Sequence, residues 1–256
     1  MTFVVQTSFN NSFYSGTSGI VLPVSKTLYP DEFKEKSRLE YYASIFNSIE
    51  INSSFYKLPK TSTIIRWREA VPEYFQFTFK LPKTVSHSKG LHFNDGEIER
   101  FLQTINNVGK KKACILVQLP PLLKLDKIKQ LQKLLKTLDK ANKQGAWKVA
   151  VEFRNKIWYN DEIFELLQKY NCSLVQQDLP ASATPYKEPI TDVGYLRFHG
   201  IEKGYRGSYN DKLLLEYAQH IKQWLHEGKC VYTYFNNTLG DAFNNLHTLK
   251  RFVSSL

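Results

Sequence analysis

The residues of this chain that could do chemistry stand at the ends of short apolar runs. Three carboxylates, Glu50, Glu152 and Asp178, occupy such positions, and an ionised carboxylate can act as a general base. His199 ends another run and could carry a proton near neutral pH. Three cations in the same kind of position could bind an anion or a hydroxyl group, namely Lys80, Arg154 and Arg197. We therefore expect the carboxylates and the histidine to be catalytic and the cations to bind substrate.

Neutral polar and aromatic side chains accompany these charges, at the ends of the runs or just beyond them. Hydroxyl and amide groups can bind a polar substrate, and an aromatic ring can pack against the face of a sugar or a nucleobase. The further candidate substrate-binding residues of this kind are Thr17, Asn52, Tyr56, Gln118, Tyr205, Tyr234 and Asn236. Each is also a residue type that ordinary packing uses, so the hypothesis depends on the set and not on one member.

Eight β-like runs, most of them followed by a helical pattern, must position this set. They are rich in β-branched and aromatic residues and are bounded by turn residues. The runs are Phe13–Gly19, Ser48–Phe55, Phe75–Leu81, Lys112–Leu119, Trp147–Phe153, Cys172–Asp178, Gly194–His199 and Cys230–Asn236. Strands that alternate with helices pair in parallel, and 256 residues accommodate eight strand–helix units of roughly 30 residues. We therefore predict an α/β fold, a single TIM-type (β/α)8 barrel domain over residues 1–256.

The helix signals between the runs support this alternation. The capping box Ser37-x-x-Glu40 opens a helix over Ser37–Phe46, and an amphipathic stripe marks Leu125–Asn142. Further helices are predicted at Thr61–Ala70, from Asn94 onward, and at Asp161–Tyr170, Asp211–His226 and Asp241–Val253. Leu179–Thr191 contains three prolines and reads as a loop, so the helix after the sixth strand is expected to be missing or irregular. An open doubly wound sheet is the alternative, but the sequence has no GxGxxG or Walker loop.

Alternation along each strand predicts which side chains face the barrel interior. It directs Lys80, Glu152 and Arg197 inward, toward the carboxyl ends of the strands, where barrel enzymes keep their chemistry. For the sixth run, the alternation predicts that four side chains face the barrel interior: Cys172, Leu174, Gln176 and Asp178. For the first run it does not choose between Ser15 with Thr17 and Gly16 with Ser18. The same alternation places all three cysteines inside, and without a CxxC motif we expect them reduced and buried: Cys114, Cys172 and Cys230.

The chain carries 35 Lys and Arg against 24 Asp and Glu, a net charge of +11. Such an excess suits a nucleic-acid partner, but solvated lysine-rich helix faces give the same number. Positive charge around the mouth of the barrel, at the carboxyl ends of its strands, would support the nucleic-acid hypothesis. Positive charge scattered over the helix faces would weaken it. No run approaches 18 apolar residues and Met1–Gln6 lacks the basic region of a signal peptide, so we expect a cytoplasmic protein without a membrane partner. The sequence does not indicate an oligomeric state.

Six local strings resemble the DUF72 (YecE-like) family, in the order in which that family has them. They are Gly16–Gly19, Glu50–Tyr56 with Leu58–Pro59, Gln118–Pro121, Ala150–Arg154 with Trp158, Arg197–Gly200 with Tyr205, and Tyr234–Asn237. The resemblance covers almost the whole chain. It implies a TIM-type barrel with these strings at its carboxyl-end mouth, and it implies no known reaction.

Several chemistries compete for this mouth. A pair of the three carboxylates would suit a glycosidase, and a desolvated Lys80 would suit a Schiff base. A divalent metal could be held, as in xylose-isomerase-like barrels, by Glu152, Asp178, His199 and Asn236. We favour an enzyme that binds a polar, anionic or sugar-like small molecule with acid/base carboxylates and without a cofactor or metal. The alternatives are a nucleic-acid-binding or metal-dependent phosphodiester enzyme and a non-catalytic ligand-binding barrel.

Overall fold

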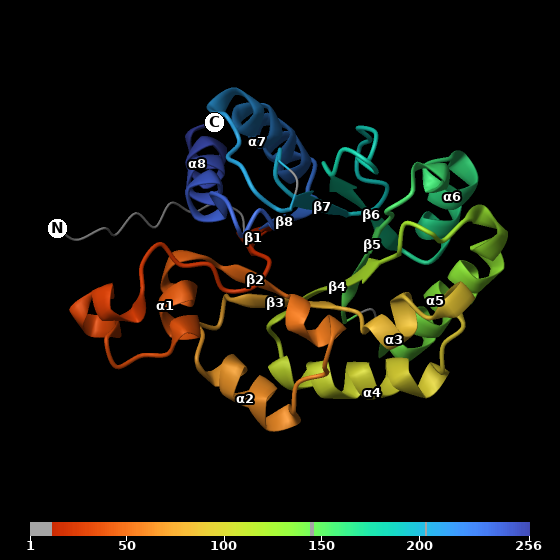
Figure 1. The fold of residues 1–256 in the computed structure, drawn as a ribbon, viewed down its shortest axis with the longest axis horizontal. Helices are drawn as coiled ribbons and strands as arrows, with labels where there is room; N and C mark the ends of the chain where they lie inside the picture. Colours follow the sequence, from red (N-terminus) through yellow and green to blue (C-terminus); the bar gives the residue numbers. More distant parts are fainter. Residues whose placement is uncertain (1–11, 144–145, 203) are drawn as a thin grey trace.

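The computed structural model describes residues 12–143, 146–202 and 204–256, so the signal-peptide expectation for Met1–Gln6 lies outside the described residues. Eight parallel strands form one sheet in the order β1-β8-β7-β6-β5-β4-β3-β2. They are β1 (Phe13–Thr17), β2 (Ser48–Ile51), β3 (Gln76–Lys80), β4 (Lys112–Gln118), β5 (Lys148–Glu152), β6 (Cys172–Gln177), β7 (Val193–Phe198) and β8 (Cys230–Phe235). A parallel bridge between Ser18 and Glu50 brings the two edges together, so the sheet is the predicted barrel and not an open sheet (Figure 1).

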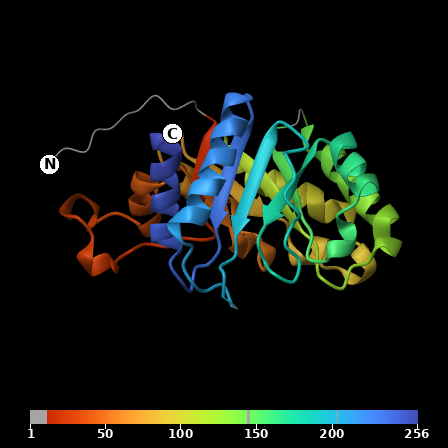
Figure 2. The ribbon, with the colours of Figure 1, turned by 90° about the horizontal axis from the view of Figure 1, so that it is seen from above.

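The helices of the described residues surround the barrel (Figure 2). They are α1 (Arg38–Ile45), α2 (Thr61–Glu69), α3 (Lys83–Ser86), α4 (Asp95–Ile105), α5 (Ile128–Ala141), α6 (Asp161–Lys169), α7 (Asp211–His226) and α8 (Ala242–Ser255). The predicted capping box is present, because Glu40 N donates to Ser37 Oγ (3.2 Å) and Ser37 N donates to Glu40 Oε2 (2.7 Å). The segment between β6 and β7 contains no helix, as its prolines predict. Within the described part of the chain, no helix is both long and apolar enough to cross a membrane.

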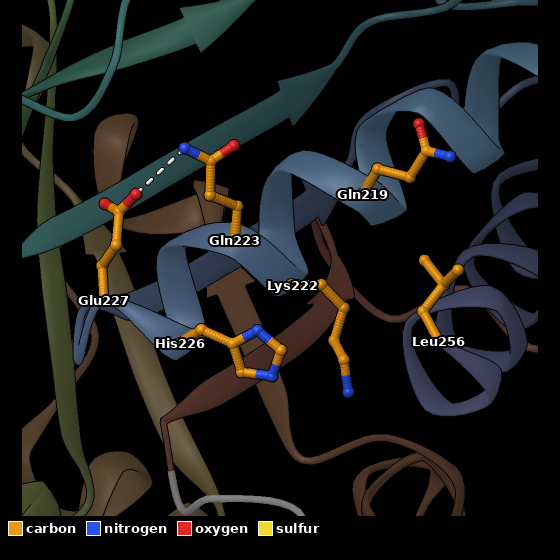
Figure 3. A pocket seen from close by; sticks show the side chains of 6 residues that line it. All are labelled: Gln219, Lys222, Gln223, His226, Glu227 and Leu256. Carbon is orange, nitrogen blue, oxygen red and sulfur yellow. Dashed lines mark hydrogen bonds between the residues drawn. The ribbon is translucent and has the colours of Figure 1, made fainter.

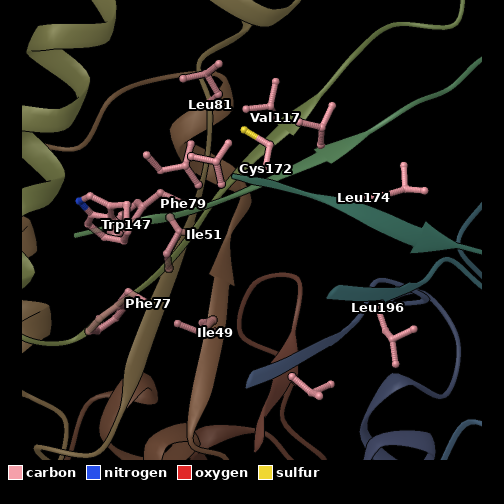
Figure 4. Packing of buried hydrophobic residues seen from close by; sticks show 14 of the residues in the cluster. Ile49, Ile51, Phe77, Phe79, Leu81, Val117, Trp147, Cys172, Leu174 and Leu196 are labelled. Atoms are coloured by element: carbon pink, nitrogen blue, oxygen red, sulfur yellow. The ribbon is translucent and has the colours of Figure 1, made fainter. Parts of the chain in front are cut away.

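Apolar side chains on the outer face of the strands form the main core. On β3, Phe77 and Phe79 point toward the helices and pack with Trp147, while Thr78 faces the interior, as alternation predicts (Figure 4). The interior holds a second, smaller apolar cluster that includes Leu116. β2 ends earlier than predicted, since residues 52–55 form a short 3-10 helix, η3 (Asn52–Phe55). The outer core therefore fixes the strands, and the inner face is left to carry polar groups.

The predicted facing of β6 is wrong by one residue. Leu174 packs in the outer core (Figure 4). Val175 instead lies in the interior and pairs with Tyr195 of β7. Two apolar residues are adjacent here, so β6 has no clean alternation to fix its facing, and a shift of one residue exchanges the two faces. As a consequence, the β6 residue that pairs with Arg197 is Gln177, whereas the prediction had placed its neighbours Gln176 and Asp178 on the inner face.

The three cysteines are free, as predicted, but they do not share one face. Cys114 and Cys230 belong to the interior cluster, whereas Cys172 packs in the outer core (Figure 4). Cys172 therefore corrects the prediction that all three face inward, for the reason that applies to β6 as a whole. Cys114 and Cys172 are buried and Cys230 is half-buried.

The contact between β1 and β2 depends on a glycine. A Cβ atom on Gly16 would lie 1.9 Å from the carbonyl oxygen of Ser48, so a residue without a side chain is required at this approach. The side chain of Asn47 bonds to β1 beside it, where its Oδ1 accepts from Ser15 N and its Nδ2 donates to the Phe13 carbonyl, both at 2.8 Å.

These contacts settle the facing of β1, which the sequence left open. Ser18 points inward, since its hydroxyl donates to Glu50 Oε1 at 2.6 Å. Thr17 points toward α1, where its backbone N–H donates to the hydroxyl of Tyr42 at 2.7 Å. Gly16 and Ser18 are therefore the interior pair.

We predict that Gly16→Ala destabilises the fold, because the added methyl group must push β1 away from Ser48. The free energy of unfolding should fall by about 1–3 kcal/mol or more, the cost of an overpacked core. Chemical denaturation measures it, and Gly96→Ala is the matched control, since a Cβ there meets only the Asn94 side chain at 3.3 Å. Equal stability of the two variants would contradict this account of the β1–β2 contact.

Candidate functional site

Two carboxylates and one guanidinium form a buried ionic network near the carboxyl ends of β2, β5 and β7. Arg197 Nη2 donates to Glu50 Oε1 at 2.7 Å, and Arg197 Nη1 donates to Glu152 Oε2 at 2.6 Å. Arg197 is 2% exposed, and the two carboxylates are fully buried. A buried charge costs several kcal/mol unless it is paired, so each member of this network depends on the others.

Glu50 is held by two further donors that the sequence-based site did not include. The hydroxyls of Ser18 and Tyr195 each donate to its carboxylate at 2.6 Å. Tyr195 precedes Arg197 by two residues and thus shares its inward face, which is the signal that could have found it. Ser18 lies inside the Gly16–Gly19 string, but the open facing of β1 hid its role. With three donors, the Glu50 carboxylate is fixed as an acceptor.

Glu152 is the second anchor of the network. Arg154 Nε donates to its Oε1, and His199 Nε2 lies 3.5 Å from the same oxygen. Burial alone would raise the pKa of the Glu152 carboxyl, but the guanidinium groups of Arg197 and Arg154 outweigh burial and hold that pKa well below its usual range. Glu152 is therefore an ionised acceptor whose oxygens are already engaged.

Above this network lies a half-buried layer that consists of Lys80, Gln118 and Arg154. Lys80 Nζ donates to Gln118 Oε1 at 2.8 Å, and Arg154 Nη2 donates to the same oxygen at 3.3 Å. Lys80 also lies 4.1 Å above the ring of Phe55, which the sequence-based site did not include. Burial and the charge of Arg197 lower the pKa of Lys80 to about 8, although Glu152 and Glu50 oppose the shift. Two cations thus share one neutral acceptor.

His199 is held in place through both its backbone and its imidazole ring. Its backbone N–H donates to Asp178 Oδ1 at 2.7 Å, and its ring Nδ1 lies 3.0 Å from Asn236 Nδ2. Burial lowers the pKa of the His199 imidazole against the opposing charge of Glu152, so the ring is neutral at pH 7. The ring Nε2 lies 3.3 Å from Arg154 Nη2, which is a donor, and 3.5 Å from Glu152 Oε1, which is an acceptor, so each ring nitrogen has a nitrogen donor within reach.

Asp178 holds the loop after β7 and does not point into the network. Its second oxygen accepts from the hydroxyl of Tyr209, which itself accepts from Gly200 N at 2.6 Å. Burial raises the pKa of the Asp178 carboxyl, and the hydrogen bonds from Tyr209 and His199 oppose that shift. Asp178 is thus tied to backbone and hydroxyl donors beside His199.

The remaining predicted site residues lie at different depths. Tyr234 is buried in the barrel interior, where its hydroxyl lies 2.7 Å from those of Ser48 and Thr78. Asn52 begins η3 with its Oδ1 buried and unpartnered among the described residues. Tyr205 is 40% exposed with its ring 5.8 Å from that of His199, and Tyr56 is 81% exposed. Thr17, bonded to Tyr42 on the outer face of β1, is apart from the network.

The donor set does not fit a divalent metal. Among the described residues, no group of three or more His, Cys, Asp or Glu side chains is arranged to hold an ion. Of the four predicted ligands, Glu152 is engaged by two guanidinium groups, and Asp178 by Tyr209 and a backbone N–H. The cations of Arg154 and Arg197 on Glu152 would also repel a second cation there.

A family model described as a protein of unknown function, DUF72, matches residues 14–255. The chain belongs to the DUF72 family. A segment of 82 residues is 38% identical to the UPF0759 protein YecE of Escherichia coli K12, over 32% of this chain and 30% of YecE, so the match spans less than a third of that relative. The UPF0759 protein YunF of Bacillus subtilis 168 is 24% identical over 86% of this chain and 87% of YunF.

Solved structures agree with this assignment. A DUF72 family protein from Enterococcus faecalis V583 superposes with a TM-score of 0.79 at 22% identity, covering 94% of this chain and 95% of that one. D-allulose 3-epimerase from a Methylomonas species, solved in complex with D-allulose, gives a TM-score of 0.57 at 11% identity, with 96% and 98% covered. The DUF72 chain thus shares its barrel fold with sugar epimerases.

We predict that Glu152→Gln strongly destabilises this DUF72 protein, because it leaves Arg154 and part of Arg197 buried without a counter-charge. The free energy of unfolding should fall by about 3–5 kcal/mol at pH 7. Since the pKa of Glu152 is lowered by folding, its contribution is complete above the ordinary carboxyl pKa and is lost as the pH falls below that value. Denaturation across pH checks both points, with the exposed Glu165→Gln as control. A change no larger than the control's would show that the network does not hold the fold.

We also predict that one lysine of this DUF72 protein titrates near pH 8. Nuclear magnetic resonance of the 13C-methylated protein should show one lysine signal with this pKa, and Lys80→Gln should remove it. Because folding lowers the affinity of Lys80 for its proton, this group makes stability rise with pH between about 8 and 10.5. A Lys80 signal that titrates with the other lysines would contradict the burial and charge environment described above.

Proposed function

We propose that this DUF72 protein binds an anionic, hydroxyl-rich small molecule at the carboxyl ends of its barrel strands. The observation that carries the proposal is the convergence of Lys80 and Arg154 on one neutral oxygen of Gln118. An anion that replaced Gln118 as the acceptor would satisfy both cations with charge-assisted hydrogen bonds, which are stronger than bonds to an amide.

The charge balance of the network supports an anionic ligand. Glu50 and Glu152 are offset by Arg197 and Arg154, and Lys80 adds a further positive charge in the half-buried layer. Asp178 is not paired with these cations, because its oxygens accept from two neutral donors, the Tyr209 hydroxyl and the His199 backbone N–H. Glu50 and Glu152, which sequence analysis assigned to acid/base chemistry, thus serve here as positioning residues that keep the guanidinium groups in place.

Lys80 is the group that we assign to proton transfer in a conversion of the bound molecule. Its pKa of about 8 lies near the pH at which a general acid works, and its ammonium can donate to a substrate oxygen. Sugars and their phosphates are the compounds to test first, because the barrel is shared with a sugar epimerase and because exposed rings such as Tyr205 can pack against a sugar face.

We predict that fructose 6-phosphate binds more tightly than fructose, and that the affinity falls as the pH rises through about 8 because Lys80 loses its proton. Lys80→Gln should weaken binding about tenfold or more, the value of one charge-assisted hydrogen bond. Isothermal titration calorimetry measures this, and binding above pH 8 should take up a proton. The exposed Lys83→Gln, three residues away, is the control.

The proposal fails if fructose 6-phosphate and inorganic phosphate both leave the calorimetric signal unchanged at pH 7. It fails equally if Lys83→Gln weakens binding as much as Lys80→Gln, since the effect would then follow net charge. A phosphodiester enzyme at this mouth would instead require turnover of a labelled oligonucleotide that Lys80→Gln abolishes.

A further inference from the structure

The positive charge of this chain is concentrated in one segment. Residues 110–148 contain eleven Lys, no Arg and two Asp, so they carry +9 of the net +11. This segment contains β4 and α5 and ends at the start of β5. The excess is therefore concentrated in one sector of the barrel, that of β4 and α5, and part of it lies on the face of α5.

A groove of about 890 Å³ lies in this sector, between α4 and α5, which are neighbours in the fold (Figure 1). One wall is polar and comes from α4, which contributes Gln103 and the residue after its end, Asn106. Trp147 lies against this wall, with its Nε1 donating to Asn106 Oδ1 at 2.9 Å. The lysines that line the groove are Lys112, Lys133, Lys136, Lys140 and Lys143.

The two ends of the groove differ in charge. At one end Lys133 pairs with Asp95 at 3.3 Å, and Glu99 lies on the same helix. The other four lysines have no carboxylate within ion-pair distance in the part of the chain that the structure describes. Lys136 and Lys140 stand one helical turn apart on α5, about 6 Å along its axis, and Lys143 follows the helix. Like charges at this spacing repel one another, and a polyanion bound across them would relieve that repulsion.

Not every concavity of the described residues has this property. The one between α7 and the C-terminal residue Leu256, of about 430 Å³, is lined by Lys222, His226, Glu227 and glutamines (Figure 3). Its carboxylate accepts from Gln223 Nε2 at 3.0 Å. One lysine beside one carboxylate gives no net excess, so this concavity does not share the accumulation of lysine in the groove between α4 and α5.

We infer that this groove binds the sugar–phosphate backbone of a single-stranded nucleic acid, at a site separate from the mouth and independent of the function proposed there. Lysine ammonium groups bind phosphate as point charges, and a positively charged groove of this kind can follow the backbone of a single strand. Trp147 is 2% exposed and offers no ring for base stacking, so binding is insensitive to base sequence. A membrane surface would favour large exposed apolar side chains beside the lysines, whereas the large apolar side chains among the described lining residues, Leu102 and Trp147, are buried.

Fluorescence anisotropy with a labelled oligothymidylate and the full chain tests this inference. Binding should be measurable at low salt and should weaken linearly in logarithmic plots of affinity against salt. In Lys136→Gln/Lys140→Gln, the slope should decrease by about 1.4, because two phosphate contacts are lost at about 0.7 each for a single strand. Both side chains are exposed, so the melting temperature should not change.

The matched control removes the same charge from the carboxyl-end side. Lys57→Gln/Lys60→Gln changes two exposed lysines that follow η3, and it should bind the oligonucleotide like the unmodified protein. A duplex of mixed sequence should bind more weakly than the single strand. The inference is overturned if no binding occurs at low salt, or if both double variants lose affinity equally. It is also overturned if anionic vesicles or polyglutamate bind as well as the oligonucleotide with the same dependence on Lys136 and Lys140.

Discussion

A single guanidinium joins three strands across the interior of this barrel. Arg197 of β7 donates to Glu50 of β2 and to Glu152 of β5, and all three groups are withdrawn from solvent. An arginine does not lose its proton in a protein, so Arg197 and Arg154 together bring two fixed positive charges to the two carboxylates. The planar guanidinium also fixes direction, which lysine would not do. The positions of the groups above the network follow from this constraint.

The division into two layers explains how charged residues can serve both stability and binding. The lower layer satisfies its own charges, and the carboxylate of Glu152 anchors Arg154 from below. Arg154 can then present its other nitrogen to Gln118, together with Lys80. The upper layer is half-buried, so a reduced dielectric strengthens the attraction between its cations and an anion. The cations nevertheless stay within reach of a ligand. The fold thus holds the ligand-binding groups in position before the ligand arrives.

Sequence alone predicted the barrel and most of the network. Strand periodicity placed Lys80, Glu152 and Arg197 on inward faces because their strands alternate cleanly between apolar and polar residues. It failed on β6, where Leu174 and Val175 are adjacent, and it could not decide β1, where Gly16 has no side chain to mark a face. The hydrogen bonds of Asp178 and Tyr209 join segments far apart in the chain, and no local pattern contains that information.

Both the sequence and the structure were needed to locate the positive charge of the protein. Counting lysines locates the excess in residues 110–148, but only the packing of α4 against α5 shows that the two helices enclose a groove. The mouth and this groove are different surfaces with different chemistry. One is a small polar site that the buried network supports, and the other is an open row of lysines.

The most direct measurement of the central claim is a crystal structure of the protein grown with fructose 6-phosphate. The account predicts the phosphoryl group within hydrogen-bond distance of both Lys80 Nζ and Arg154, with the side chain of Gln118 moved aside and the Glu50–Arg197–Glu152 network unchanged. A phosphoryl group bound away from these two cations, or a network that rearranges to admit it, would contradict the account.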